Sequence, residues 1–193
     1  RRAARVRITA GVWTSWFLAR NIRRFWSEDA NWVPDILASN RPVDLARRQA
    51  DIGIRNKRPD HDWLAGRLTS RIENAEYGIS EEVTGFIALP LDGPPSPTAR
   101  WIRENKADRI VMIASDSRLA IELAFEGIGR VVLPCFAGDA EPRLKRLSPP
   151  IEGLGHDQWL VAHHEARHDP PVRAALDALT RLLTDSSLRS DTV

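Results

Sequence analysis

Five residues near the C-terminal end of the chain match the pattern with which many zinc hydrolases bind their metal. His164-Glu165-Ala166-Arg167-His168 has two histidines four residues apart, and the glutamate could act as a general base if all three shared one helix face. Pro170-Pro171 follows almost at once, and a residue before proline is biased away from helical backbone, so we expect a loop here. No histidine follows His168 and no glutamate follows Glu165 as a third ligand. We therefore predict no metal site, no catalytic residue and no cofactor, and keep zinc hydrolase as an alternative that a metal analysis would reveal.

Two short polar turns, each between an expected strand and an expected helix, could bind a negatively charged ligand. One runs from Gly11 to Ser15 and the other from Ser115 to Ser117. The first turn of a helix has unpaired backbone N–H groups and the positive end of the helix dipole, so it favours carboxylates and phosphates. We expect a hydroxyl residue, Thr14 or Ser15, to be the N-cap of the first of these helices. The candidate binding residues in the two turns are Gly11, Trp13, Thr14, Ser15, Ser115, Asp116 and Ser117.

Arg55, which directly follows an expected strand, would add a cation whose two-pronged geometry suits a carboxylate. Asp116 places a negative charge beside the second turn, so it could instead accept a hydrogen bond from the ligand or pair with Arg55. The alternative interpretation is that the Ser and Thr residues only cap helices and that Arg55 is a solvated strand end. Both interpretations stay open at this point.

Cys135 is the only cysteine, which excludes an intramolecular disulfide and a cysteine-rich zinc site. It could be a redox switch, but without a second cysteine to resolve an oxidised thiol we favour a buried apolar role. The net charge of +2 is too small to bind a polyanion by charge alone. No apolar run approaches the roughly 18 residues of a membrane helix, so we expect no membrane partner.

The spacing of apolar residues predicts strands that alternate with helices, which favours an α/β fold with parallel strands. In such sheets ligands bind at the carboxyl ends of the strands, next to helix N-termini. We expect the strand at 110–113 to be buried and the last helix to begin after Pro170-Pro171, with an apolar stripe from Val172 to Leu183. The expected strands are 6–10, 33–39, 51–55, 110–113, 131–133 and 158–162.

Several segments, in their order and spacing, resemble the C-terminal half of LysR-type transcriptional regulators. In that family a helix ending in Gly-x-Gly leads into a strand closed by Leu-Pro, which Glu122 to Pro134 reproduces. The resemblance spans roughly Val6 to Leu183. The other segments that carry it are Val6 to Gly11, Ala50 to Arg55, Cys135 to Leu147 and Gln158 to Leu179.

The resemblance implies an effector-binding domain of the type 2 periplasmic-binding-protein fold. Such an α/β fold has two lobes, each a mixed but mainly parallel sheet flanked by helices, with a cleft between them. The implied lobes are residues 1–73 plus 154–193 and residues 74–153. The family's N-terminal winged helix-turn-helix is expected to be absent from this chain, so DNA contact would come only through that part. The resemblance also implies a cytoplasmic homodimer or homotetramer and no enzymatic activity.

We therefore predict a domain that senses a small-molecule effector, either a carboxylate or an aromatic metabolite, which contacts both polar turns. Pro134 and Phe136, which follow the strand at 131–133, complete the predicted effector-binding set. The bulk of Trp13 suggests a small or aromatic-lined cavity. A free-standing solute-binding protein of the same fold is the main alternative, and an export signal at the genomic N-terminus would identify it.

Overall fold

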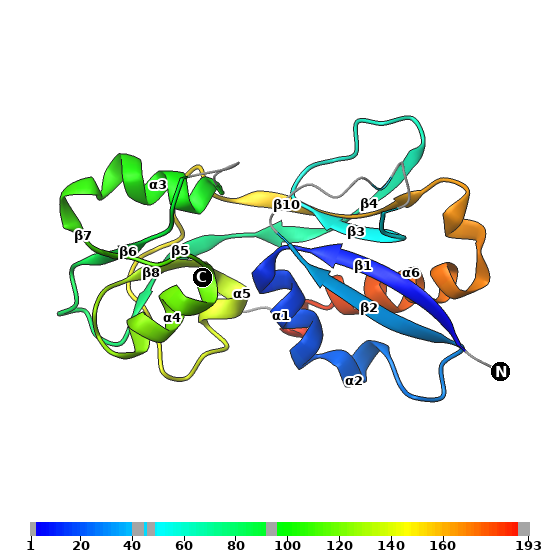
Figure 1. The fold of residues 1–193 in the computed structure, drawn as a ribbon, viewed down its shortest axis with the longest axis horizontal. Helices are drawn as coiled ribbons and strands as arrows, with labels where there is room; N and C mark the ends of the chain where they lie inside the picture. Colours follow the sequence, from blue (N-terminus) through cyan, green and yellow to red (C-terminus); the bar gives the residue numbers. More distant parts are fainter. Residues whose placement is uncertain (1–2, 40–44, 46–48, 92–95, 189–193) are drawn as a thin grey trace. The chain divides into compact units, whose positions relative to one another are not determined.

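The computed structural model describes residues 3–39, 45, 49–91 and 96–188 (Figure 1). Strands alternate with helices in parts of the chain, but the five strands between Trp32 and Ala88 follow one another with no helix described between them. The chain divides into two units, each with its own sheet and core. Unit 1 is Arg1–Arg71 with His156–Ser186, and unit 2 is Ile72–Gly155 with Ser187–Val193. The lobe boundaries implied by the resemblance, 1–73 plus 154–193 and 74–153, stay a prediction.

Unit 1 is built on a five-stranded sheet with the order β2-β1-β3-β10-β4. The central strand β1 is parallel to β2 on one side and to β3 on the other, whereas β10 is antiparallel to β3. The strands are β1 (Ala4–Ala10), β2 (Trp32–Ala38), β3 (Ile52–Arg55), β4 (Leu64–Ile72) and β10 (His156–His163).

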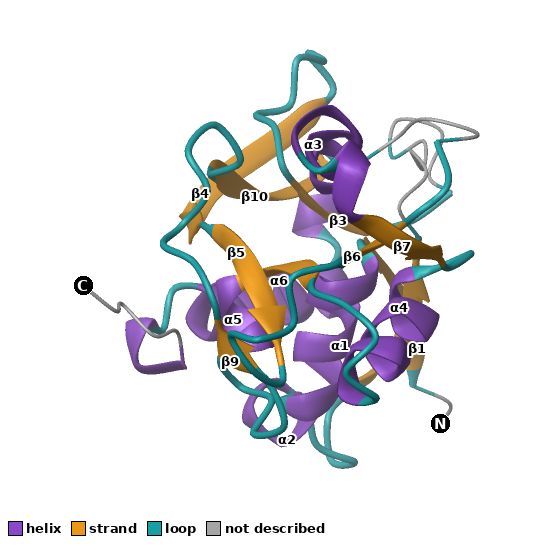
Figure 2. Ribbon diagram, turned by 90° about the vertical axis from the view of Figure 1, so that its left-hand side faces the viewer, coloured by secondary structure: helices purple, strands orange, loops and turns teal. Residues whose placement is uncertain are grey.

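Three helices pack on one face of this sheet (Figure 1, Figure 2). Val6, Ile8 and Ala10 alternate along β1 and are buried on that face. Helix α6 begins at Pro170 itself, two residues earlier than expected, and it buries the predicted apolar stripe between Val172 and Leu183. The helices are α1 (Val12–Arg20), α2 (Ile22–Phe25) and α6 (Pro170–Leu183), with short 3-10 turns η2 (Ala166–His168) and η3 (Ser186–Leu188).

Unit 2 contains a three-stranded sheet, β8-β5-β9, and a parallel pair, β6-β7, joined by a parallel bridge between Phe86 and Arg130. The Ile87 N–H donates to the Arg130 carbonyl at 2.9 Å, and the Arg130 N–H donates to the Gly85 carbonyl at 2.7 Å. Because of this bridge, β7, β6 and β8 all run in the same direction, while β5 is antiparallel to β8 and to β9. The strands are β5 (Asn74–Gly78), β6 (Phe86–Ala88), β7 (Ile110–Ile113), β8 (Val131–Pro134) and β9 (Lys145–Arg146).

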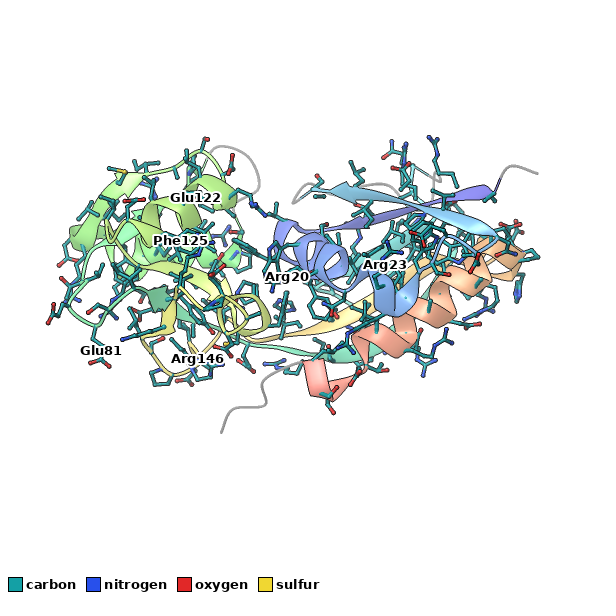
Figure 3. The ribbon with its side chains drawn as sticks, turned by 90° about the horizontal axis from the view of Figure 1, so that it is seen from below. Arg20, Arg23, Glu81, Glu122, Phe125 and Arg146 are labelled. Atoms are coloured by element: carbon teal, nitrogen blue, oxygen red, sulfur yellow. The ribbon has the colours of Figure 1, made fainter. Side chains whose placement is uncertain are left out.

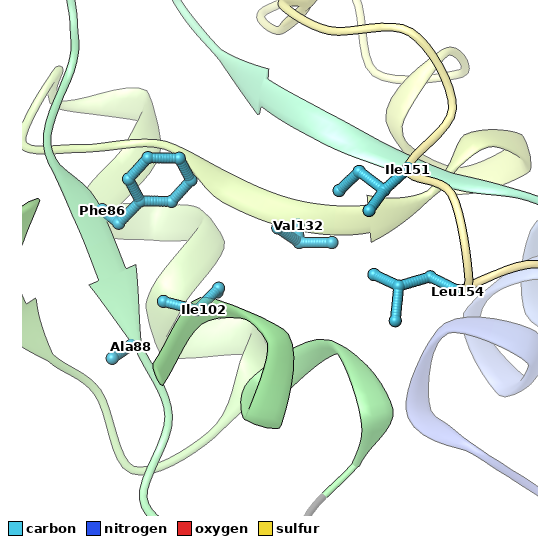
Figure 4. Packing of buried hydrophobic residues seen from close by; sticks show 6 residues of the cluster. All are labelled: Phe86, Ala88, Ile102, Val132, Ile151 and Leu154. Atoms are coloured by element: carbon cyan, nitrogen blue, oxygen red, sulfur yellow. The ribbon is translucent and has the colours of Figure 1, made fainter. Parts of the chain in front are cut away.

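The core of unit 2 joins its strands to a helix and a loop. Trp101 and Ile110 pack against the edge of this cluster. The helices of the unit are α3 (Pro97–Asn105), α4 (Ser117–Phe125) and α5 (Cys135–Gly138), with a 3-10 turn η1 (Ala107–Arg109). Figure 4 shows the six buried members, which are Phe86, Ala88, Ile102, Val132, Ile151 and Leu154.

The expected strands are present, but the predicted burial of residues 110–113 is wrong. In β7 the exposed fractions are 55% for Val111, 39% for Met112 and 57% for Ile113. Within the described residues β7 pairs only with β6, so it is an edge strand. A short apolar run indicates a strand, but it does not indicate whether another layer covers that strand.

No helix among the described residues combines the length and the apolar composition that crossing a bilayer requires.

Candidate functional site

The first candidate turn lies at the carboxyl end of β1, where α1 begins. The N-cap of α1 is Gly11, with φ −62° and ψ 168°, and its carbonyl accepts the Ser15 N–H at 2.9 Å. The prediction that Thr14 or Ser15 caps this helix is therefore wrong, since both lie within its first turn. Glycine is also an accepted N-cap, and hydroxyl residues a few positions later do not reveal which residue leaves the helical conformation.

The N-cap residue Gly11 has no side chain to cap α1, and no acidic residue lies in the first turn of this helix. The Ser15 hydroxyl does not take that role, because it lies 3.3 Å from the Ala10 carbonyl, to which it donates, and Ser15 is only 7% exposed. Thr14 and Trp13 are half-buried. The positive end of the helix dipole is therefore not neutralised by a nearby carboxylate of α1, and an anion would be stabilised there.

The strand order makes this turn a topological switch point. The chain leaves β1 through α1 to pair β2 on one side, and later returns to pair β3 on the other side, parallel in both cases. Open α/β sheets bind ligands at such points, beyond the carboxyl ends of their strands. In the pairing of β1 with β3, Thr9 lies opposite Gly53, so Gly11 and Arg55 are at the same level. The structure thus brings two of the predicted residues, Gly11 and Arg55, to one edge of the sheet.

The side chain of Arg55 folds back over Gly53 of its own strand, because Gly53 has no side chain to block it. A Cβ on Gly53 would lie 2.9 Å from Arg55 Nε and 2.7 Å from Leu45 Cδ1. Partial burial lowers the pKa of the Arg55 guanidinium, which is nevertheless a cation at neutral pH. A cation removed from part of its water gains more from a bound anion than a fully solvated one does.

Thr9, a residue that the sequence reasoning missed, lies beside this group. It is fully buried and pairs with Gly53, yet its Oγ1 atom has no hydrogen-bond partner among the described residues. Buried hydroxyls are usually paired, so an unpaired one next to a candidate site is notable. Its only sequence signal was a hydroxyl between the buried apolar residues Ile8 and Ala10.

Aromatic and cationic side chains continue from this turn along α1. The rings of Trp13 and Trp16 meet edge to face, with centroids 6.1 Å apart and an interplanar angle of 79°. Arg20, labelled in Figure 3, has its Cζ 4.8 Å from the centroid of the Trp16 ring. Trp13 therefore belongs to an aromatic surface, which would suit a ligand that carries a ring.

In unit 2 the predicted cap cluster between β7 and α4 is present, with Asp116 as the N-cap. Asp116 has φ −149° and ψ 167°, and its Oδ1 accepts the Leu119 N–H at 2.8 Å. The hydroxyls of the exposed Ser115 and the half-buried Ser117 make no hydrogen bond within the part of the chain that the structure describes. This helix end is thus neutralised by its own carboxylate but keeps two hydroxyl groups for a ligand.

Pro134 and Phe136 lie at the same end of the unit 2 sheet as this cap cluster. Both are half-buried, Pro134 as the last residue of β8 and Phe136 within α5. Because β7 and β8 run in the same direction, their carboxyl ends share one edge. The predicted residues therefore form one group in each unit, and their part in effector binding stays a prediction.

Cys135 is buried, and burial raises the pKa of its thiol. The neighbouring Tyr77 hydroxyl donates to Asp139 Oδ1 at 2.7 Å, and Asp139 also accepts from Arg146 Nε at 3.1 Å. A buried thiol with a raised pKa has little thiolate at neutral pH, so this environment favours the structural role over the redox role.

The His164 to His168 segment does not form the continuous helix that a zincin site requires. It consists of a turn and the 3-10 turn η2, and α6 begins only at Pro170. Among the residues that the structure describes, no group of three His, Cys, Asp or Glu side chains could hold a metal ion.

No family model matches the sequence, and no curated protein is similar to it by sequence. Solved structures do match. The regulatory domain of CrgA, a LysR-type transcriptional regulator from Neisseria meningitidis, is 18% identical over 94% of this chain and 99% of that chain, with a TM-score of 0.74. The effector binding domain of AmpR from Citrobacter freundii is 15% identical over 93% of this chain and 98% of that chain, with a TM-score of 0.64. Full-length CbnR in complex with its target DNA is 14% identical over 94% of this chain and 71% of that chain, with a TM-score of 0.63.

These likenesses establish the fold. The chain has the two-lobed α/β fold of LysR-type regulatory domains, which is of the periplasmic-binding-protein type, and this confirms the predicted fold class.

Proposed function

We propose that this chain is the effector-sensing regulatory domain of a LysR-type transcriptional regulator and that its effector carries a carboxylate. The observation that carries the proposal is the N-terminus of α1, where the N-cap residue Gly11 has no side chain and the first turn has no acidic residue. It lies at the switch point of the sheet, level with Arg55. The shared fold with LysR-type regulatory domains supports the regulatory role.

A carboxylate fits the group in unit 1 better than a cation or a neutral ligand does. The N–H groups at the start of α1 and the guanidinium of Arg55 are hydrogen-bond donors. The helix dipole is positive at this end of α1 and Arg55 is positively charged, so both favour an anion. Thr9 has a buried hydroxyl without a partner in the described chain, and the hydroxyl of Thr14 lies in the first turn. Trp13 would contact the apolar part of the effector.

Unit 2 would contribute hydroxyl and apolar contacts to the same effector through Ser115, Ser117 and Phe136. Asp116 would repel a second carboxylate there, so we expect the effector to present a hydroxyl, an amide or a ring to this unit. An effector that binds both turns favours one arrangement of the two units by its differential affinity. A DNA-binding winged helix-turn-helix would respond to that arrangement, without any chemical step.

Binding is tested by thermal shift with benzoate and succinate and with their uncharged amides, benzamide and succinamide. A ligand that binds only the folded chain raises its unfolding midpoint. We expect a rise with at least one carboxylate, none with its amide, and loss of the rise in Arg55→Gln. Arg24→Gln is the matched control, because Arg24 is an exposed arginine on α2 of the same unit. If the carboxylate raises the unfolding midpoint equally in the wild type and in Arg55→Gln, the proposed anion site is wrong.

A homo-oligomer is the second part of the proposal, and the exposed apolar side chains of β7 support it. Val111, Met112 and Ile113 are exposed in succession, and Leu119 on α4 is exposed as well. Contiguous exposed apolar surface of this kind marks interaction sites, here with a second copy. The mass in solution, measured by light scattering, should fall to that of a single chain in Val111→Ser/Ile113→Ser. An unchanged mass would show that β7 is not the interface.

A further inference from the structure

We infer that unit 2 has a second ligand site, for a small organic monocation with an apolar body, in a cavity between α3 and the turn at Glu152 and Gly153. The cavity has a volume of about 330 Å³. This volume is at the lower end of the range for small-molecule sites, which starts near 300 Å³. All its lining residues belong to unit 2, so the inference is independent of the carboxylate site proposed for α1.

The apolar part of the lining rests on the core of the unit. Leu154 is a buried member of the core cluster (Figure 4), and Trp101 packs against the same cluster. Gly153 has φ +85°, and a Cβ at this position would meet no atom within 4 Å. The positive φ favours glycine here, and the missing side chain leaves this wall of the cavity open. A ring or a short alkyl chain could therefore enter over a surface that the core already fixes.

The charges around the cavity favour a cation. Glu104 on α3 and Glu152 on the turn line it together with a single arginine, Arg100, so the lining has one more negative than positive group. None of the three forms an ion pair within the described residues, although Arg100 and Glu104 are four positions apart on one helix. Arg173 and Asp177 have the same spacing on α6 and do pair, at 2.7 Å. The carboxylates of the cavity are thus available to a ligand, whereas Arg100 would repel a second positive charge.

Trp101 strengthens the preference for a cation. The ammonium of Lys106 lies 5.8 Å from its ring centroid and 5.6 Å from that of Phe86, yet Lys106 does not line the cavity. The indole therefore already attracts one cation, and the same residue lines the cavity. Indole rings are the aromatic side chains that bind cations best.

Three probes that share a phenyl ring and differ mainly in charge test the site on the whole chain. They are phenethylamine, phenethyl alcohol and 3-phenylpropionate, and the indole N–H signal of Trp101, assigned with Trp101→Phe, reports the place of binding by NMR. We expect phenethylamine to shift that signal saturably, the alcohol to bind several-fold more weakly and the anion not to bind. Equal binding of the three probes, stronger binding of the anion, or an unshifted Trp101 signal would each overturn the inference.

Removing the carboxylates tests the charge argument directly. Glu104→Gln/Glu152→Gln should weaken phenethylamine by about five-fold for each carboxylate removed, as expected for partly exposed ion pairs. Glu81→Gln/Glu82→Gln is the matched control, because these exposed glutamates belong to the same unit but do not line the cavity. Glu81 is labelled in Figure 3. Circular dichroism would verify that both variants are folded. Undiminished affinity in the folded Glu104→Gln/Glu152→Gln variant would overturn the inference, while Arg55→Gln should leave phenethylamine binding unchanged.

Discussion

The two helices that follow the candidate turns begin in opposite ways. In unit 1, α1 begins after Gly11, which offers no side chain, and its first turn has no acidic residue. In unit 2, α4 begins after Asp116, whose carboxylate already accepts the Leu119 N–H at 2.8 Å. A helix end that carries its own carboxylate gains little from a bound anion, whereas a helix end without a carboxylate gains more. We therefore expect a negatively charged ligand to be recognised by unit 1 rather than by unit 2.

Two buried polar side chains, Thr9 in unit 1 and Arg130 in unit 2, also differ in how they are paired. In unit 1, Thr9 keeps a hydroxyl without a partner among the described residues. In unit 2, Arg130 donates to Glu76 Oε1 at 3.1 Å, to the Val83 carbonyl at 2.6 Å and to the Glu81 carbonyl at 3.1 Å. The Arg130 network therefore holds the structure of unit 2, while Thr9 leaves a hydroxyl that a ligand could use. The difference is between these two sites and not between whole units, because Arg103 Nε in unit 2 is also buried without a partner among the described residues.

The largest effect is expected from breaking the Arg130 network of unit 2. Arg130→Met leaves the Glu76 carboxylate, whose side chain is only 12% exposed, without its cation. Removing one partner of a buried pair costs about 3–5 kcal/mol of unfolding free energy. Urea denaturation measures the loss. The double variant Arg130→Met/Glu76→Leu should recover much of it, because it removes the stranded charge, and a single variant as stable as the wild type would contradict the structural role of this network.

Alkaline pH should also act on unit 2, through Tyr77 and Cys135. Burial raises the pKa of both groups, and the hydrogen bond to Asp139 adds to the effect on Tyr77. A group whose pKa is raised by folding stabilises the fold below its unfolded-state pKa, and this contribution is lost as the pH rises towards the folded-state value. The ordinary pKa values are 9.0 for Cys and 10.0 for Tyr, so stability should decline above pH 9.0. The slope is at most about 1.4 kcal/mol per pH unit for each group.

Urea denaturation between pH 7 and pH 11 measures this decline. Cys135→Ala should remove the part that begins near pH 9.0, and Tyr77→Phe the part that begins near pH 10.0. If the wild type and both variants lose stability with identical slopes, the groups responsible lie elsewhere in the chain.

Whether a structural feature could be predicted from the sequence depends on how close along the chain the residues that determine it lie. The stripe of α6 and the strand at Val131–Pro134 were predictable, because periodicity and the flanking prolines act within one element. The start of α1 was misplaced by one turn, since Gly11 and the hydroxyl residues after it are all acceptable caps. The exposure of β7 and the unpaired hydroxyl of Thr9 depend on neighbours that are distant in sequence. No pattern of residue types along a single strand reports those neighbours.

A smaller effect is expected from removing the cap of α4. Asp116→Ala should lower the unfolding free energy by about 1 kcal/mol, the usual value of an N-cap side chain. It should also make the start of α4 resemble that of α1, so a carboxylate that binds the wild type weakly should bind this variant more tightly. Thermal shift with the benzoate and succinate panel measures both changes. Ser115→Ala is the control, because Ser115 precedes the cap, and equal destabilisation by both variants would show that the cap of Asp116 contributes nothing.

The smallest effect, and the one of opposite sign, is expected from Thr9→Val in unit 1. Valine has nearly the same shape as threonine and lacks the hydroxyl that is buried without a partner, so the variant should be more stable by up to about 1 kcal/mol.

Thr69→Val is the matched control in the same unit. The Thr69 hydroxyl lies 3.0 Å from the Gln158 carbonyl, to which it donates, and its loss should destabilise the fold by about 1 kcal/mol. If the hydroxyl of Thr9 contacts the effector, the Thr9→Val variant should bind the effector more weakly although the variant is more stable. A purely structural role of the hydroxyl would not weaken effector binding. A destabilised Thr9→Val variant would instead show that this hydroxyl is paired in solution, and the contrast between the two units would then rest on their helix ends alone.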